Sequence, residues 1–264
     1  MTSTLRTRVS WFGQRTVALG WAFLASDITQ DVARRPAVVF APHADDETLG
    51  CGATILLKRA NTMPVTVVVA TDGSHFPHGV APEVNRRVRH LELLEACGRL
   101  GVEASNVIHL AHPEARLEER STQLADDVAR ILGDHDLASC DVFSTNPWDP
   151  HLDHRTLGRV VRTVALYSGV RLYEYPIWQW GRLRGWAPTA GKVFSAGHPV
   201  KVRAANHRDA KEHSLRAYLS QLQPELGGYT SNGLAKPFVA QFLRDSEVFF
   251  RVRPQPPAVA SPLT

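Results

Sequence analysis

The stretch "AVVFAPHADDETLGCG", residues 37 to 52, joins a short apolar run to a histidine and three consecutive acids. An apolar run of this length is typical of a buried strand, and the pattern of residues 48–60 is helical. The acids Asp45, Asp46 and Glu47 repel one another, and a helix N-terminus or a metal ion would offset that repulsion. The stretch therefore predicts a strand, a charged turn and a helix.

The same alternation of apolar runs and helical patterns continues along the chain. Alternation of this kind is typical of βαβ units. It predicts an α/β fold of the Rossmann-like, doubly wound class, with a mostly parallel sheet and helices on both faces. The expected strands are 37–42, 65–73, 106–112, 141–147 and 171–178, and the expected helices are 48–60, 82–100, 123–132 and 155–166.

The rhythm changes after residue 180. Residues 192–197 and 200–205 predict a hairpin, and residues 207–221 predict a helix. The chain of 264 residues contains 44% hydrophobic residues, enough to bury one large core.

The domain organisation follows from what the sequence lacks. It has no internal repeat and no linker long enough to separate two domains. We therefore expect a single domain over residues 1–264, with an N-terminal helical extension at 1–36. The proline-rich segment 254–264 is expected to be a frayed, disordered tail.

Charge and cysteine content narrow the function classes. The net charge of +4 is spread over small basic groups, which is too dilute for a nucleic-acid footprint but compatible with an anionic ligand. The three cysteines, Cys51, Cys97 and Cys140, match neither a disulfide framework nor a thiolate metal site. A cytoplasmic location is the simplest interpretation.

The N-terminus places Arg6, Arg8 and Arg15 before the apolar stretch "TVALGWAFLA", residues 16–25. This stretch is about half the roughly 20 residues that a transmembrane helix needs, so we expect no transmembrane segment. The absence of a convincing cleavage site favours a packed or surface-lying amphipathic helix over a secretion signal. An amphipathic helix of this kind is compatible with peripheral membrane contact.

Two polar loops are expected at the same edge of the sheet. In an open parallel sheet, ligands bind outside the carboxyl ends of the strands. The turn at 43–47 follows the first expected strand, and "NPWDPHLDHR", residues 146–155, follows the fourth. If these strands are neighbours, as in the usual doubly wound order, the two loops meet.

The residue types in the two loops suit a catalytic metal. Three protein ligands with an open position are typical of catalytic zinc, and histidine and carboxylate are its common ligands. His43 and Asp46 come from one turn, and His154 or His151 from the other. Asp45 would then lie beside the metal without binding it, where a carboxylate serves as a general base.

Simpler interpretations exist for each loop alone. Asp45 and Asp46 could cap the helix that follows, because acids are favoured in the first helical turn. His151 and His154 could be solvated surface histidines. Together these interpretations weaken, because both loops fall at one sheet edge and capping does not explain His43.

The segments "PHADDETLGCG" and "HLDH" resemble the PIG-L/LmbE family of zinc-dependent N-acetylglucosamine deacetylases. The resemblance covers most of residues 37–221, with weaker support from "TDG" at 71–73, "RHLELLEACGRLG" at 89–101 and "KEHSLRAYLSQ" at 211–221. It implies an LmbE-like fold and a hydrolase that acts on a linear amide bond. It also implies a small-molecule or glycoconjugate amino-sugar substrate.

The resemblance assigns roles to individual residues. The zinc ligands would be His43, Asp46 and His154, and other divalent transition metals are compatible with them. Asp45 would be the general base, and His151 would polarise the acetyl carbonyl. The remaining assignments are Asp153 as the residue that orients a histidine, and Arg89, Glu114 and Arg155 as substrate contacts.

The sequence departs from the family pattern in three places. Ala44 replaces a proline, Ala53 stands where many relatives have a second glycine, and Glu114 stands where relatives often carry an aspartate. The last change leaves the identity of the substrate open, although not the reaction. Arg89 also has a simpler interpretation, as a helix-surface arginine near Glu92.

Other residues near the motifs have two interpretations each. The histidines of "GSHFPHG" could line the entrance of the site or be solvated, and the tryptophans of "IWQWGRLRGW" could stack on a sugar or pack in the core. Cys51 is interpreted as a small buried hydrophobe. The residues concerned are His75, His78, Trp178, Trp180 and Trp186.

The expected function is removal of the acetyl group from an N-acetylated amino sugar by a metal-activated water. One alternative is a receiver-like metal-binding module. It needs a phosphoacceptor aspartate after the third strand, and "NVIHLAHPE" offers none. A second alternative is a sugar-binding module without deacetylase activity, against which the retention of Asp45 and three ligands argues.

Overall fold

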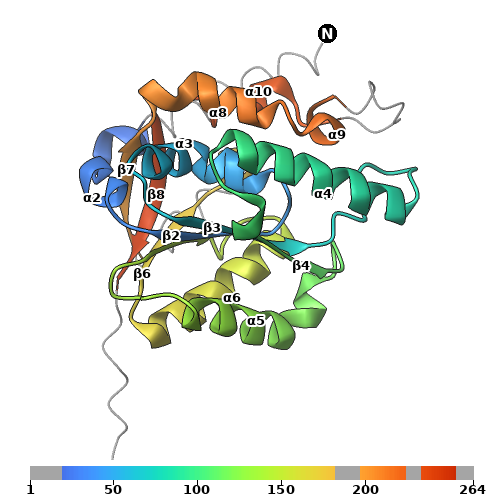
Figure 1. Cartoon of the computed structure of the whole chain (residues 1–264), viewed down its shortest axis with the longest axis horizontal. Coiled ribbons are helices and arrows are strands. Elements are labelled where there is room, and N and C mark those ends of the chain that lie inside the picture. Colours follow the sequence, from blue (N-terminus) through green and yellow to red (C-terminus); the bar gives the residue numbers. More distant parts are fainter. Residues whose placement is uncertain (1–19, 182–196, 224–232, 254–264) are drawn as a thin grey trace, which may run out of the picture.

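The computed structural model describes residues 20–181, 197–223 and 233–253. Within these residues an eight-stranded, mostly parallel sheet has helices on both faces, which confirms the expected fold class (Figure 1). The strand order is β1-β7-β8-β6-β5-β2-β3-β4. The strands are β1 Ser26–Asp27, β2 Ala37–Ala41, β3 Val65–Thr71, β4 Val107–His112, β5 Asp141–Thr145, β6 Arg171–Tyr175, β7 Gly197–Arg203 and β8 Ser246–Val252.

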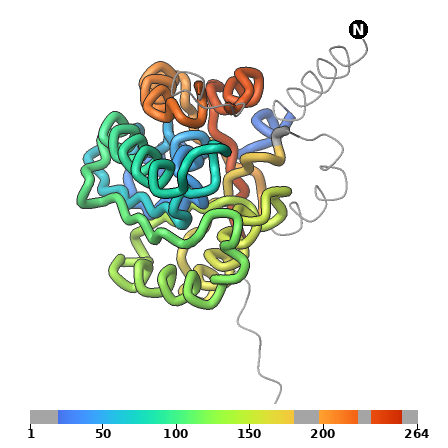
Figure 2. The backbone as a smooth tube through the Cα atoms, turned by 90° about the vertical axis from the view of Figure 1, so that its right-hand side faces the viewer, coloured from blue at the N-terminus to red at the C-terminus, as the bar shows by residue number. Residues whose placement is uncertain are grey.

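Two layers of helices cover the sheet, and the turned view separates them clearly (Figure 2). Helices α3, α4 and α8 lie on one face, and α5 and α6 lie on the other (Figure 1). The longer helices are α3 Asp46–Ala60, α4 Pro82–Arg99, α5 Ser121–Gly133 and α6 Leu152–Ser168, and the shorter ones are α2 Thr29–Ala33, α8 Arg208–Leu215, α9 Leu219–Leu222 and α10 Lys236–Val239.

The central strands read as continuous apolar runs because both of their faces are buried. Along β2, Val39 packs into the core beneath α3 and α4, whereas Val38 and Phe40 pack into the core beside α5 and α6. All five residues of β2 are buried. Because side chains alternate along a strand, this one strand contributes apolar side chains to the cores on both faces of the sheet.

The strands and helices predicted between residues 37 and 175 are present, with shifted ends. The helix expected at 48–60 begins at Asp46, and the one expected at 155–166 begins at Leu152. These earlier starts place Asp46 and Glu47 in the first turn of α3, and Asp153 and His154 in the first turn of α6.

The C-terminal third differs from the sequence prediction. Residues 200–203 lie in β7, but β7 pairs antiparallel with β8 and parallel with β1. Residues 192–196 of the expected hairpin lie outside the described residues. The helix expected at 207–221 is interrupted, so that α8 and α9 flank a turn at 216–218.

The two chain ends are described only in part. Residues 1–19 and the expected tail 254–264 lie outside the described residues. Residues 20–24 are helical, and Trp21 packs edge-on against Phe250 with ring centroids 5.2 Å apart. Across the described ranges, no helix combines the length and the apolar character that spanning a membrane requires.

The order of the central strands brings the two motifs together. β2 pairs in parallel with β5, so the turn after β2 and the loop after β5 leave the sheet at the same edge. Gly158 allows α6 to approach the end of β5, because a Cβ there would lie 2.5 Å from the carbonyl oxygen of Thr145. The start of α6 is therefore held close to the strand ends.

Candidate active site

The turn between β2 and α3 has a strained backbone at Asp45. Its φ angle is 129°, a conformation that favours glycine. The backbone N–H of Asp45 donates to Oε2 of Glu47 at 3.0 Å, which helps to hold this conformation. The Asp45 side chain makes no cap hydrogen bond to α3, so the capping interpretation does not account for it.

Three side-chain atoms from the two loops form a small triangle. Nδ1 of His43 lies 3.1 Å from Nε2 of His154, and Oδ2 of Asp46 lies 3.2 and 3.3 Å from these two atoms. Donor atoms bound to a tetrahedral zinc at about 2.0–2.1 Å lie about 3.3 Å from one another. The donor set and its spacing therefore fit a zinc ion.

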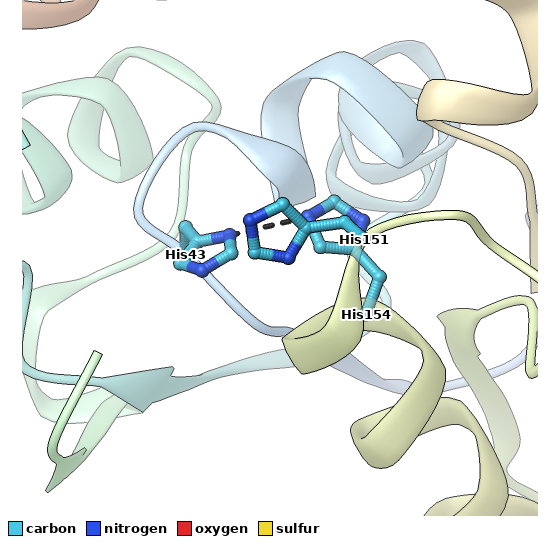
Figure 3. Close-up of side chains that lie close together, drawn as sticks. All are labelled: His43, His151 and His154. Carbon is cyan, nitrogen blue, oxygen red and sulfur yellow. Dashed lines mark hydrogen bonds between the residues drawn. The ribbon is translucent and has the colours of Figure 1, made fainter. Parts of the chain in front are cut away.

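A second grouping of possible ligands includes His151. Ligand atoms of His43, His151 and His154 all lie within 4.8 Å of one another. Figure 3 shows the three rings side by side, with the hydrogen bond between His43 and His154 as a dashed line. This grouping is looser than the triangle that contains Asp46, so His151 borders the closest set of ligand atoms.

Two of the three side chains in the triangle, His154 and Asp46, have the charge states that metal binding needs, which are a neutral histidine and an ionised carboxylate. Burial lowers the pKa of His154 to about 3, although Asp46 opposes this. Burial raises the pKa of Asp46, but His154 and His43 outweigh it and the pKa is lowered. Burial also lowers the pKa of His43, but hydrogen bonds to Asp153 and Asp46 raise it to about 10. His43 would therefore release a proton when a metal binds.

Asp45 lies beside the triangle and lines the same cavity. Its side chain is buried, and burial together with the charge of Asp46 raises its pKa well above the usual range, against the opposing effects of Arg89 and His43. A buried carboxylate with a raised pKa is typical of a general acid or base.

Two further carboxylates stand behind the histidines. Oδ2 of Asp153 lies 3.1 Å from Nε2 of His43, and the Asp153 carboxylate also accepts the backbone N–H groups of Ala115 and Leu117. Burial raises the pKa of Asp153, but His43 and these amides lower it to about 2.

Asp149 has the corresponding place behind His154 and was missed by the sequence analysis. Its Oδ1 lies 3.8 Å from Nδ1 of His154, which is buried and has no hydrogen-bond partner. The carboxylate accepts the backbone N–H groups of His151 and Trp178, both at 2.9 Å. The only sequence signal for this role of Asp149 is its position two residues before His151.

Of the three expected substrate contacts, Arg89 and Glu114 line the cavity and Arg155 does not. Arg89 is 2% exposed, so it is not a helix-surface arginine. Its guanidinium donates to Oε1 of Glu114 at 2.8 Å and to the carbonyl of Ala44 at 3.1 Å. Arg155 is not among the cavity-lining residues, and its Nη1 lies 3.5 Å from the carbonyl oxygen of Asp149.

A cavity of about 580 Å³ opens at this edge of the sheet. Its walls include His75, His78 and Trp178, for which the sequence left two interpretations. The side chains of Trp180 and Trp186 lie outside the described residues, and Cys51 is buried away from the cavity wall. Lining residues that the sequence analysis did not single out are Leu49, Phe76, Ala115, Ile177, Gln221, Gly233, Leu234, Ala235 and Phe238.

Residues 38–165, which contain the triangle and both carboxylates behind it, match the model of the PIG-L family, described as GlcNAc-PI de-N-acetylase. These residues form a PIG-L family domain. The match confirms the resemblance found in the sequence. No curated protein matches the chain.

Solved structures share the fold of this chain, including its PIG-L domain at residues 38–165. The N,N'-diacetylchitobiose deacetylase of Pyrococcus horikoshii is 20% identical, with a TM-score of 0.61 over 83% of this chain and 84% of that one. The deacetylase of the A40926 pseudoaglycone is 19% identical, with a TM-score of 0.61 over 84% and 98% of the two chains. A hydratase, 4-carboxy-2-hydroxymuconate hydratase from Pseudomonas putida, is 15% identical with a TM-score of 0.53 over 87% and 100%. The shared fold therefore does not by itself specify the reaction.

Proposed function

We propose that the protein is a zinc-dependent deacetylase that hydrolyses the amide of an N-acetylglucosamine-type sugar, free or in a glycoconjugate. The observation that carries this is the triangle of ligand atoms, 3.1 to 3.3 Å apart, beside the buried carboxylate of Asp45. The PIG-L family domain supports hydrolytic deacetylation more broadly.

His43, Asp46 and His154 would hold the zinc ion. Bound zinc supplies a Lewis acid for the amide carbonyl and makes a water molecule more acidic. Asp45 accepts the proton of the attacking water and passes it to the departing amine, a role that its raised pKa supports.

His151 and Asp153 would assist the reaction in different ways, His151 at the substrate and Asp153 at a metal ligand. His151 donates a hydrogen bond to the carbonyl oxygen as negative charge develops there. Its partly buried ring, with centroids 4.9 Å from His43 and 4.8 Å from His154, supports this role. Asp153 holds His43 through its distal nitrogen, as a carboxylate commonly does for a metal-bound imidazole.

The sugar hydroxyls would contact Arg89 and Glu114, whose ion pair lines the cavity. Arg155 would contact a larger conjugate from outside the lining. We further propose that residues 1–264 form one domain, and that the protein works in the cytoplasm, a reducing compartment that suits its three buried free cysteines.

The test is acetate release from N-acetylglucosamine and its glycosides, measured with the zinc-loaded protein and again after chelation. We expect acetate with zinc, none after chelation, and recovery on adding zinc back. Sugar binding without acetate release would point to the binding module, and activity that survives chelation would refute the zinc-dependent mechanism.

A further inference from the structure

The strand order divides the cavity into two halves with different chemistry. The triangle belongs to the loops after β2 and β5, at the centre of the sheet. On the side of β3 and β4 lie His75, Arg89 and Glu114, which we call the charged half, and the apolar Phe76, next to His75 in the chain, also lines the cavity. On the side of β6 lies a wall of apolar side chains.

This wall, the apolar half, consists of Ile177, Trp178, Leu234, Ala235 and Phe238. Trp178 stacks on Phe238, with ring centroids 4.6 Å apart and ring planes 22° from parallel. The backbone N–H of Leu234 donates to the carbonyl oxygen of Gln221 at 2.7 Å, which anchors the segment before α10.

The apolar half begins close to the triangle, and Asp149 fixes the spacing. One oxygen of Asp149 accepts the backbone N–H of Trp178 at 2.9 Å, and the other lies 3.8 Å from Nδ1 of His154. A substrate group next to the reacting carbonyl can therefore reach Trp178 without crossing the charged half.

The geometry of the amide indicates which part of the substrate lies in each half of the cavity. Its carbonyl carbon stands between the acyl chain and the nitrogen, so these two substituents leave the reacting centre in different directions. Sugar hydroxyls need hydrogen-bond partners, because burying them unpaired is costly. The charged half offers several such partners, whereas the side-chain hydrogen-bonding groups at the apolar half are those of Trp178 and of Gln221, which lines the cavity next to Leu234.

We infer that the apolar half receives the acyl chain, and that the protein hydrolyses N-acylated amino sugars whose acyl group is longer than acetyl. This inference rests on the proposed hydrolysis and specifies its substrate. The amide C–N bond breaks, the water oxygen bonds to the acyl carbon, and the products are a short-chain carboxylic acid and a free amino sugar.

The test compares glucosamine release from N-acetyl-, N-butanoyl- and N-hexanoylglucosamine. Each buried methylene should raise kcat/KM about 4-fold, so the butanoyl amide, with two more methylenes, should exceed the acetyl amide by about 16-fold. Hexyl N-acetylglucosaminide is the matched control, because it carries the alkyl chain on the sugar. Equal rates for the three amides, or an equal gain with the hexyl glycoside, would overturn the inference.

Two variants test whether the preference for a longer acyl chain depends on the apolar half. Leu234→Ser should lower kcat/KM for the hexanoyl amide by several-fold more than for the acetyl amide, since it removes apolar surface from the wall of the cavity. Leu219→Ser is the matched control, because Leu219 is 51% exposed and does not line the cavity. A loss of chain-length preference in both variants, or in neither, would contradict the assignment.

A binding experiment separates the inference from the proposed function. Zinc-loaded Asp45→Asn protein, titrated calorimetrically, should bind N-hexanoylglucosamine at least about 10-fold more tightly than N-acetylglucosamine. Equal affinities would overturn the inference whatever the activity. Preferential binding with no glucosamine released by the wild-type protein would refute the hydrolysis and leave the apolar half as the site of the acyl chain.

Discussion

Asp153 and His43 form a buried pair in which Oδ2 of Asp153 lies 3.1 Å from Nε2 of His43. The opposite ring nitrogen of His43, Nδ1, belongs to the triangle with Asp46 and His154. Asp153 is fixed in turn by the backbone of the segment after β4, through Ala115 and Leu117. A loop that follows β4, two strands away from β2 in the sheet, thereby sets the orientation of a ligand that belongs to the first motif.

Asp153→Asn should weaken zinc binding by about 10- to 100-fold, because an amide holds the imidazole less firmly than a carboxylate does. Competition with a fluorescent chelator measures the affinity. Asp126→Asn is the control, since Asp126 is an exposed acid on α5. If both variants bind zinc like the wild type, Asp153 does not position His43.

The choice between the two ligand groupings depends on His151. His43→Ala and His154→Ala should each lose stoichiometric zinc, because both residues belong to the triangle. His151→Ala should keep its zinc and lose about 100-fold or more in turnover, the usual effect of removing an oxyanion donor. Elemental analysis and acetate release decide this, with the exposed His213→Ala as control. Loss of zinc from His151→Ala would favour the three-histidine grouping.

Gly158 gives a prediction about stability. In Gly158→Ala the new Cβ would lie 2.5 Å from the carbonyl oxygen of Thr145 and 2.8 Å from the backbone nitrogen of Pro147. We expect the free energy of unfolding in urea to fall by about 1–3 kcal/mol. Gly98→Ala, in α4 with nothing within 4 Å, should instead raise it by up to about 1 kcal/mol. Equal effects of the two substitutions would show that α6 can shift away from β5.

Buried Glu174 predicts a pH dependence of stability away from the triangle. Burial raises its pKa from 4.5 to about 7, although Arg162 opposes this. Between these values the unfolded chain releases the proton while the folded protein keeps it, so the unfolding free energy falls as pH rises. The loss should be on the order of 3 kcal/mol between pH 4.5 and 7.

Glu174→Gln isolates that contribution, because the variant has no carboxyl proton at this position. As pH rises from 5 to 8, the unfolding free energy of the wild type should fall relative to that of the variant. Groups that titrate in both proteins cancel in this difference. A difference independent of pH would mean that Glu174 is already ionised at pH 5.

The sequence predicted the fold where neighbouring segments along the chain are also neighbours in space. The pattern of residues 37–175 predicts strands and helices locally. The parallel pairing of β2 with β5, which are distant along the chain, follows instead from the usual doubly wound order. The strand β8 was not predicted, and β7 was assigned the wrong partner. Their pairing joins Gly197 to Val252 across most of the C-terminal third, which local patterns cannot reveal.

The same limit applies to the cavity. The triangle, Asp45 and Asp153 lie in two short motifs, so spacing and a resemblance were enough to single them out. Arg89 is buried because Glu114, 25 positions along the chain, pairs with it, and helical periodicity alone cannot show such a partner. Leu234 and Phe238 reach the cavity only through the path of the chain after β7.

The adjacent residues Asp45 and Asp46 should respond differently to the same substitution. Asp45→Asn removes a proton acceptor but preserves size, so turnover should fall by on the order of 100-fold or more while zinc stays bound. Asp46→Asn replaces a charged atom of the triangle, so zinc affinity itself should fall. Zinc content and acetate release, measured on both variants, separate the two roles. A fully active Asp45→Asn protein, or one that loses zinc more readily than Asp46→Asn, would mean that base and ligand have been exchanged in this assignment.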